Sequence, residues 1–97
     1  MAKPSLHDRF EAMNEEYLHF ERIESPRHPR RDICAFLMLH DLNPGDHGVM
    51  VSADNHDEIW LRVEPHFLEW VSDGVLRDLI RCGVSYSKGE ESLYMFV

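Results

Sequence analysis

Apolar side chains near the start of the chain recur at steps of four and three residues, which is the spacing of one stripe on a helix. They are Leu6, Phe10, Met13, Tyr17 and Phe20. Ser5 and Asp8 resemble a capping box, in which the serine oxygen accepts a hydrogen bond from a backbone N–H at the helix start. The pattern predicts a first helix over residues 6–24. Its stripe fits packing on the protein's own core or, as an alternative, the seam of a homodimer.

A stiff connector is expected next. The two prolines in residues 25–31 fix their own φ and push the residues before them out of the helical region. Residues 32–42 are apolar nearly all round, a pattern that suits a buried strand or a buried helix. Residue type favours a short buried helix, because only Ile33 is β-branched and Asp32 can cap the start. Pro44 and Gly45 then end the element.

Two pairs of strands are predicted downstream. Residues 49–53 and 58–63 flank one polar turn, and residues 84–87 and 93–97 flank another. Between the two pairs, Pro65 fits the first turn of a helix whose broad apolar face is expected to run to Gly83, a C′ glycine. Ser72, Asp73 and Gly74 mark a point where this helix can kink or restart.

Alternation in these strands predicts apolar side chains on both faces of the sheet. Trp60 alternates with Ile59 and Leu61, so one of these faces must point away from the sheet core, toward the first helix or another chain. In the last strand Tyr94 and Phe96 face one side and the other apolar residues face the opposite side. That strand is therefore expected to be central in the sheet or covered by a partner.

The order of elements indicates an α+β fold, in which two β-hairpins form a small, mostly antiparallel sheet with about three helices packed on it. A chain of 97 residues with 43% hydrophobic content fits one domain over residues 1–97. The longest apolar run, residues 33–39, is far shorter than a membrane span. Residues 1–9 also offer no apolar region of the kind a secretory signal requires, so the cytoplasm is the expected location. Cys34 and Cys82 lie among apolar neighbours and are expected to stay reduced.

Charged residues are unevenly distributed along the chain. Residues 1–31 hold six acids and six bases, whereas residues 32–97 hold twelve acids and four bases, so the whole net charge of −8 lies downstream of Arg31. A field of one sign attracts basic proteins or cations and repels nucleic acid and anionic membranes. We therefore expect a protein partner with a basic surface, and neither direct nucleic-acid binding nor membrane binding.

Histidines and carboxylates mark the candidate site. In the first predicted hairpin, the loop over residues 43–48 and the turn over residues 54–57 lie at opposite ends, roughly 17 Å apart. His66 follows the returning strand, so it should lie near His47 rather than near the turn. The predicted partner-binding residues are Asp41, Asp46, His47, Glu64 and His66. Residues 54–58 are expected to form an ordinary turn.

The same end of the hairpin allows an alternative metal site, because imidazole and carboxylate are suitable ligands for zinc or iron. Its residues would be His40, His47 and His66 with Asp46 or Asp41. No short metal-binding spacing, phosphate loop, GxGxxG or CxxC motif is present, so no cofactor is expected and an enzyme is disfavoured.

Two hypotheses from different classes follow. The favoured one is a small acidic, non-catalytic module or inhibitor that docks on a basic partner surface, possibly that of a nucleic-acid-handling protein. The alternative is a metal-binding protein or metal-assisted hydrolase that uses His40, His47 and His66.

Overall fold

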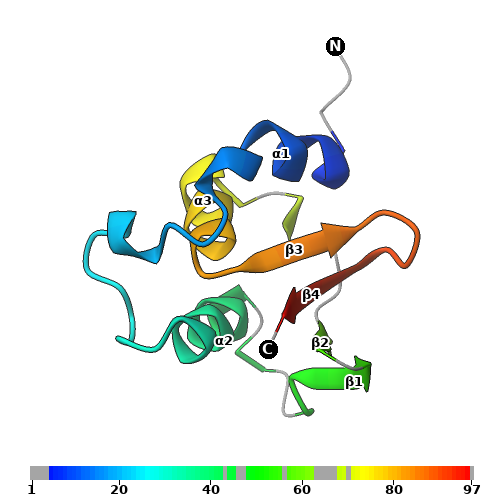
Figure 1. Cartoon of the computed structure of the whole chain (residues 1–97). Helices are drawn as coiled ribbons and strands as arrows, with labels where there is room; N and C mark the ends of the chain where they lie inside the picture. Colours follow the sequence, from blue (N-terminus) through cyan, green and yellow to red (C-terminus); the bar gives the residue numbers. More distant parts are fainter. Residues whose placement is uncertain are drawn as a thin grey trace.

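The computed structural model describes residues 5–42, 44–45, 48–55, 57–62, 68–69 and 71–96. Its three α-helices are α1 (Leu6–Ala12), α2 (Arg31–Leu42) and α3 (Asp73–Arg81). The strands are β1 (Val51–Asn55), β2 (Glu58–Leu61), β3 (Val84–Ser87) and β4 (Ser92–Phe96). They form a sheet in the order β1-β2-β4-β3, with antiparallel pairing between all neighbours (Figure 1). The predicted α+β class is confirmed.

The helix predicted over residues 6–24 is wrong in its length. Ser5 caps the start as expected, since its Oγ accepts from the Asp8 backbone N–H, but α1 ends at Ala12. Two short 3-10 turns, Asn14–Glu16 and Phe20–Arg22, follow it. Between these turns Leu18 takes a left-handed conformation (φ 64°), and its backbone N–H donates to the Ile80 carbonyl at 3.2 Å. A contact with a distant segment therefore overrides the local periodicity.

The apolar stripe nevertheless packs on the protein's own core. Phe10 is buried, and the other four members of the stripe are partly buried against the core cluster. These four are Leu6, Met13, Tyr17 and Phe20. The stripe thus contributes to the fold of this chain itself, and a homodimer seam would have to use what remains exposed.

The buried helix predicted over residues 32–42 is confirmed as α2. Cys34, Ala35 and Leu39 are its buried residues. The Asp32 carboxylate accepts from the Ile33 backbone N–H at 2.9 Å in the first turn. Leu, Met and Ala side chains fill this helix, and their high helix propensity outweighs the single β-branched residue.

The helix predicted from Pro65 to Gly83 begins later than expected. Residues 65–67 lie outside the described residues, while Leu68 and Val71 precede the α-helix and Ser72 caps it. Ser72 is extended (φ −67°, ψ 158°), and its Oγ accepts from the Val75 N–H at 3.2 Å. The restart at residues 72–74 is therefore real. At the other end Gly83 has φ 102°, as a C′ glycine requires.

The core lies between the helices and one face of the sheet. Its completely buried side chains come from both α2 and α3, from three strands and from the segment before α3. They are Leu39, Leu61, Leu68, Leu76, Leu79, Ile80, Leu93, Val84, Cys34 and Cys82. Both cysteines are free. Among the described residues, no helix is long and apolar enough to cross a membrane.

Candidate interaction surface

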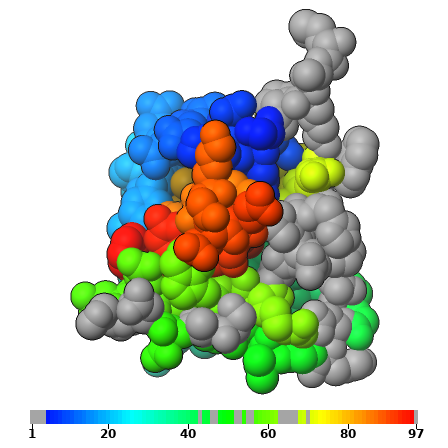
Figure 2. Space-filling view, turned by 90° about the vertical axis from the view of Figure 1, so that its right-hand side faces the viewer, coloured from blue at the N-terminus to red at the C-terminus, as the bar shows by residue number. Residues whose placement is uncertain are grey.

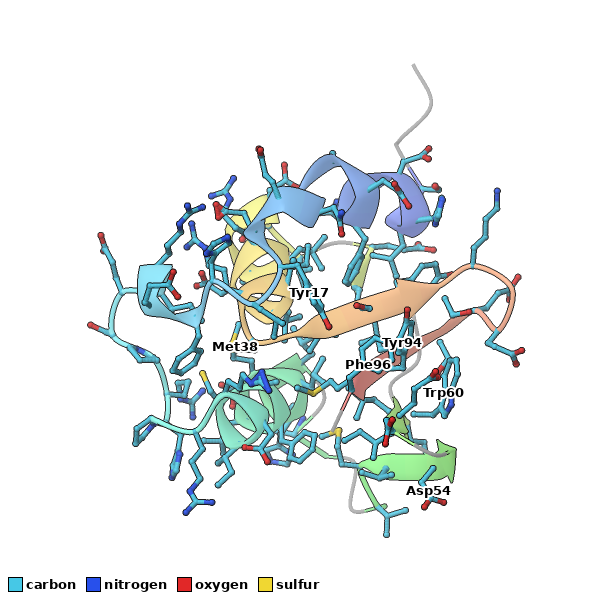
Figure 3. The ribbon with its side chains drawn as sticks, viewed as in Figure 1. Tyr17, Met38, Asp54, Trp60, Tyr94 and Phe96 are labelled. Carbon is cyan, nitrogen blue, oxygen red and sulfur yellow. The ribbon has the colours of Figure 1, made fainter. Side chains whose placement is uncertain are left out.

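An aromatic patch forms on the face of the sheet that points away from the core. Strand register sets Trp60 directly opposite Tyr94, and their ring centroids lie 5.0 Å apart. Phe96, two residues further along β4, meets Tyr94 edge to face at 5.7 Å (Figure 3). Trp60 and Tyr94 are half-buried, and Phe96 is 50% exposed. We call Trp60, Tyr94 and Phe96 the aromatic patch.

Alternation along the strands produces this arrangement. On β4, Leu93 and Met95 point into the core and are buried, which sends Tyr94 and Phe96 to the other side. On β2, buried Leu61 does the same for Trp60. The strand order then brings β2 and β4 together, so the aromatic side chains of two segments more than thirty residues apart become neighbours.

Carboxylates border one end of the aromatic patch. Glu58 lies opposite Phe96 in the β2–β4 register and shares a strand face with Trp60. Asp54, near the end of β1, lies opposite Ile59 and so on the other face of the sheet, and Asp57 lies in the turn between β1 and β2; both are exposed. We call Asp54, Asp57 and Glu58 the acidic turn. Within the described part of the chain, none of the three forms an ion pair.

Several acidic residues elsewhere are instead paired with arginines. Glu16 pairs with Arg22 at 2.8 Å and with Arg81 at 3.2 Å. These contacts, the Arg81 hydrogen bond foremost, hold the pKa of the Glu16 carboxyl below its ordinary value. Asp73 pairs with Arg9 at 2.9 Å. The acidic turn therefore presents negative charge that these arginines leave uncompensated.

A cleft of about 140 Å³ opens where α1 covers β3. We call it the α1–β3 cleft. Its polar lining is supplied by His7, Glu11, Asn14, Tyr17, Ser85, Tyr86 and Tyr94. Figure 2 shows the N-terminal segment in blue above the β3–β4 hairpin, which is orange to red, with the green β1–β2 hairpin below.

The cleft walls carry a stacked ring pair, a neutral tyrosine hydroxyl and a histidine near a carboxylate. Phe10 and Tyr86 stack with centroids 5.9 Å apart and rings tilted by 32°. Burial raises the pKa of the Tyr86 hydroxyl, and the charge of Glu91 raises it further, so this hydroxyl stays neutral and can donate a hydrogen bond. His7 Nε2 lies 3.8 Å from the Glu11 carboxylate. Tyr94 belongs to both the cleft and the aromatic patch, so the two features are continuous.

The predicted partner-binding and metal residues that the structure describes, Asp41 and His40, lie at the end of α2. Asp41 is exposed at the end of α2 and forms an ion pair with Arg27 of the connector, which compensates its charge. His40 is exposed beside it. Asp46, His47, Glu64 and His66 lie outside the described residues. In the ranges that the structure describes, no group of three His, Cys, Asp or Glu side chains is placed to hold a metal ion.

Comparison of the chain with models of known protein families, with curated proteins and with solved structures gave no match.

Sequence reasoning missed this surface for an identifiable reason. Alternation predicted that Tyr94 and Phe96 share one face of the last strand, but it left open whether Trp60 faces the core, and whether these residues meet depends on strand order. The turn over residues 54–58 was expected to be ordinary, and only the register shows that Glu58 adjoins Phe96. The α1–β3 cleft depends on packing between α1 and β3, which no local pattern encodes.

Proposed function

We propose that this chain is a small acidic, non-catalytic module that docks on a basic surface of a partner protein through the aromatic patch and the acidic turn. One observation carries the proposal: on the outer sheet face Tyr94 contacts the rings of Trp60 and Phe96, and Glu58 lies on the same face. Asp54 and Asp57 lie at the adjoining end of the sheet, and none of the three carboxylates forms an ion pair with a described residue. Aromatic side chains supply large contact area at low entropic cost and are enriched among binding hot spots.

The chemistry of such a surface favours lysine and arginine on the partner. A cation over an exposed aromatic face gains roughly 0.5–1 kcal/mol, and more when water is excluded. Each carboxylate adds a surface ion pair worth roughly 0–1 kcal/mol. These contributions are individually small. The net charge of −8 adds long-range attraction, which raises the rate of encounter with basic partners more than it raises affinity.

Basic surfaces are typical of proteins that handle nucleic acid, and such a protein is the partner class we favour. Imitation of DNA is a weaker version of the proposal, since duplex DNA carries one charge per roughly 1.7 Å and the excess here is modest by that measure. The cytoplasm is the proposed location, because Cys34 and Cys82 are free, buried thiols of the kind that reducing compartments maintain.

Affinity capture with matched variants tests the proposal. The full chain serves as bait in lysate at low and at high salt, beside D54N/D57N and the control E90Q/E91Q. Both double variants remove two negative charges, but Glu90 and Glu91 lie in the turn before β4, at the opposite end of the sheet from the acidic turn. That separation, roughly 17 Å along the strands, exceeds the Debye length of roughly 8–10 Å.

The expected result is a basic protein that is retained by the parent chain and by E90Q/E91Q, lost from D54N/D57N and released by salt. F96S should lose it as well, because the mutation removes an exposed apolar contact. A partner that binds all variants equally, or that resists high salt, would contradict docking through this surface.

A further inference from the structure

The α1–β3 cleft is too small for a drug-sized ligand and large enough for the end of one side chain. Its volume is about 140 Å³, whereas pockets for such ligands span about 300 to 1,000 Å³. The cleft also opens beside Tyr94 of the aromatic patch. A partner that covers the patch therefore has this cleft within reach of a neighbouring side chain.

The groups on the cleft walls select a cation. Hydroxyl oxygens of Tyr17, Ser85 and Tyr94 and the amide oxygen of Asn14 can all accept hydrogen bonds. Glu11 adds a carboxylate, and its side chain is 69% exposed. Among the described lining residues His7 is the sole basic group, so no permanent positive charge opposes a cationic guest.

Guanidinium fits this lining better than ammonium does. Its planar fork offers five N–H donors, pairs bidentately with a carboxylate and stacks on aromatic rings. The walls offer a carboxylate, several oxygen acceptors and the rings of three tyrosines and Phe10. An ammonium is a compact, strongly hydrated point charge, which gains less from stacking and loses more hydration on entry.

We propose that the α1–β3 cleft binds an arginine side chain of the basic partner, an assignment that rests on the proposed function because the partner supplies the arginine. The guanidinium pairs with the Glu11 carboxylate at the rim and stacks against the tyrosine rings inside. Neighbouring partner residues then cover the aromatic patch through Tyr94. The acidic turn supplies attraction to positive charge in general, while the cleft supplies a preference for arginine over lysine.

Two short peptides of equal length and charge, one bearing three arginines and the other three lysines on a glycine–serine background, serve as probes. Each is titrated into the ¹⁵N-labelled full chain while backbone amide shifts are followed. The arginine peptide should shift amides of α1 and β3, including those of Glu11 and Tyr86, and should bind at least about threefold more tightly than the lysine peptide. Equal affinities, or no shifts in α1 and β3, would overturn the proposal.

Matched variants locate the guanidinium. E11Q should weaken the arginine peptide by about threefold to fivefold, the effect of losing one exposed ion pair. E15Q carries the same charge change on an exposed residue outside the cleft lining and should leave the affinity unchanged. If E11Q and E15Q weakened peptide binding equally, the change in net charge would explain both effects, and binding in the cleft would be ruled out.

The two proposals fail in different ways. If the amide shifts were confined to residues 54–58 and 94–96, and only D54N/D57N weakened peptide binding, the arginine site in the cleft would be wrong. Docking through the aromatic patch and the acidic turn would still be supported. Conversely, arginine binding in the cleft that is unaffected by D54N/D57N and F96S would support the arginine site and count against docking through the patch. Thermal unfolding of each variant checks that it is folded.

Discussion

The guanidinium of Arg9 on α1 lies 2.9 Å from the carboxylate of Asp73 at the start of α3, sixty-four residues away in the sequence. The same side chain donates to the backbone carbonyls of Leu68, Glu69 and Val71, the last at 2.7 Å. Arg9 is only 11% exposed. One side chain thus donates hydrogen bonds to three backbone carbonyls of the segment before α3 and links that segment to α1.

Removal of Arg9 should therefore cost much more stability than removal of its acidic partner. R9A leaves three carbonyls without their donor, and we expect a loss of about 2–4 kcal/mol in the free energy of unfolding. D73A should cost less than about 1 kcal/mol, because Asp73 is 69% exposed and its pair is screened. Urea unfolding measures both. Equal losses would mean that the ion pair, rather than the carbonyl contacts, stabilises this junction.

R9K is the matched control for charge. Lysine keeps the positive charge but lacks the planar fork that reaches several acceptors at once. R9K should therefore lie close to R9A in stability. Full rescue by lysine would show that charge alone is needed at this position.

Leu18 and Gly83 meet where the N-terminal segment crosses the end of α3. Gly83 has φ 102°, and a Cβ built there would lie 2.9 Å from Leu18 Cδ2. G83A should lower the free energy of unfolding by about 1–2 kcal/mol for the backbone conformation alone, with an added contribution from the close contact. In an L18A background that contact is absent, so G83A should cost less. An identical cost in both backgrounds would assign the whole effect to the backbone.

The buried thiols should be chemically inert in the folded protein. Cys34 and Cys82 have no exposed surface, and burial raises the pKa of the Cys82 thiol, with the neighbouring Cys34 as the next cause. Because the thiolate is the reactive form, a disulfide reagent at neutral pH should modify neither cysteine in the native state and both after unfolding in denaturant. The single variants C34A and C82A identify the site if one thiol does react. Rapid native-state reaction would reveal local opening between α2 and α3.

Local signals predicted the elements, and distant contacts decided their limits. The Ser5 cap, the apolar run of α2 and the positive φ of Gly83 all follow from residue type at a given place. Where α1 ends depends on Leu18, whose amide bonds a carbonyl sixty-two residues away. The start of α3 is set by the Ser72 cap, and Arg9 donates hydrogen bonds to the backbone carbonyls that precede this cap. Periodicity carries no information about such partners.

The candidate site, like the fold, was predictable from the sequence only in part. Alternation indicated that Tyr94 lies on the face opposite Leu93 and Met95, and composition indicated excess acid in residues 32–97, but the side on which Trp60 lies was left open. Trp60 and Tyr94 meet only because β2 pairs with β4. Sequence patterns do not determine this pairing, because they are compatible with several strand orders. The ion pair between Asp41 and Arg27 could not be predicted either, because no helical or strand spacing links the two residues. Charge position along a chain is thus a poor guide to charge left exposed on a surface.

Glu16 should make stability depend on pH in the acidic range. Hydrogen bonds from Arg81 and then Arg22 lower its pKa in the folded state below the ordinary value of 4.5, against an opposing contribution from burial. A carboxyl with a depressed folded pKa stabilises the protein above its unfolded pKa, and that stabilisation is lost as pH falls through the folded value. E16Q should therefore have a lower free energy of unfolding than the parent chain at neutral pH. This difference in stability, the gap between the two proteins, should narrow below pH 4.5. R81A should narrow the same gap by returning the Glu16 pKa toward its ordinary value. Urea unfolding from pH 7 to pH 3 measures these curves, and a gap independent of pH would show that Glu16 acts through packing rather than charge.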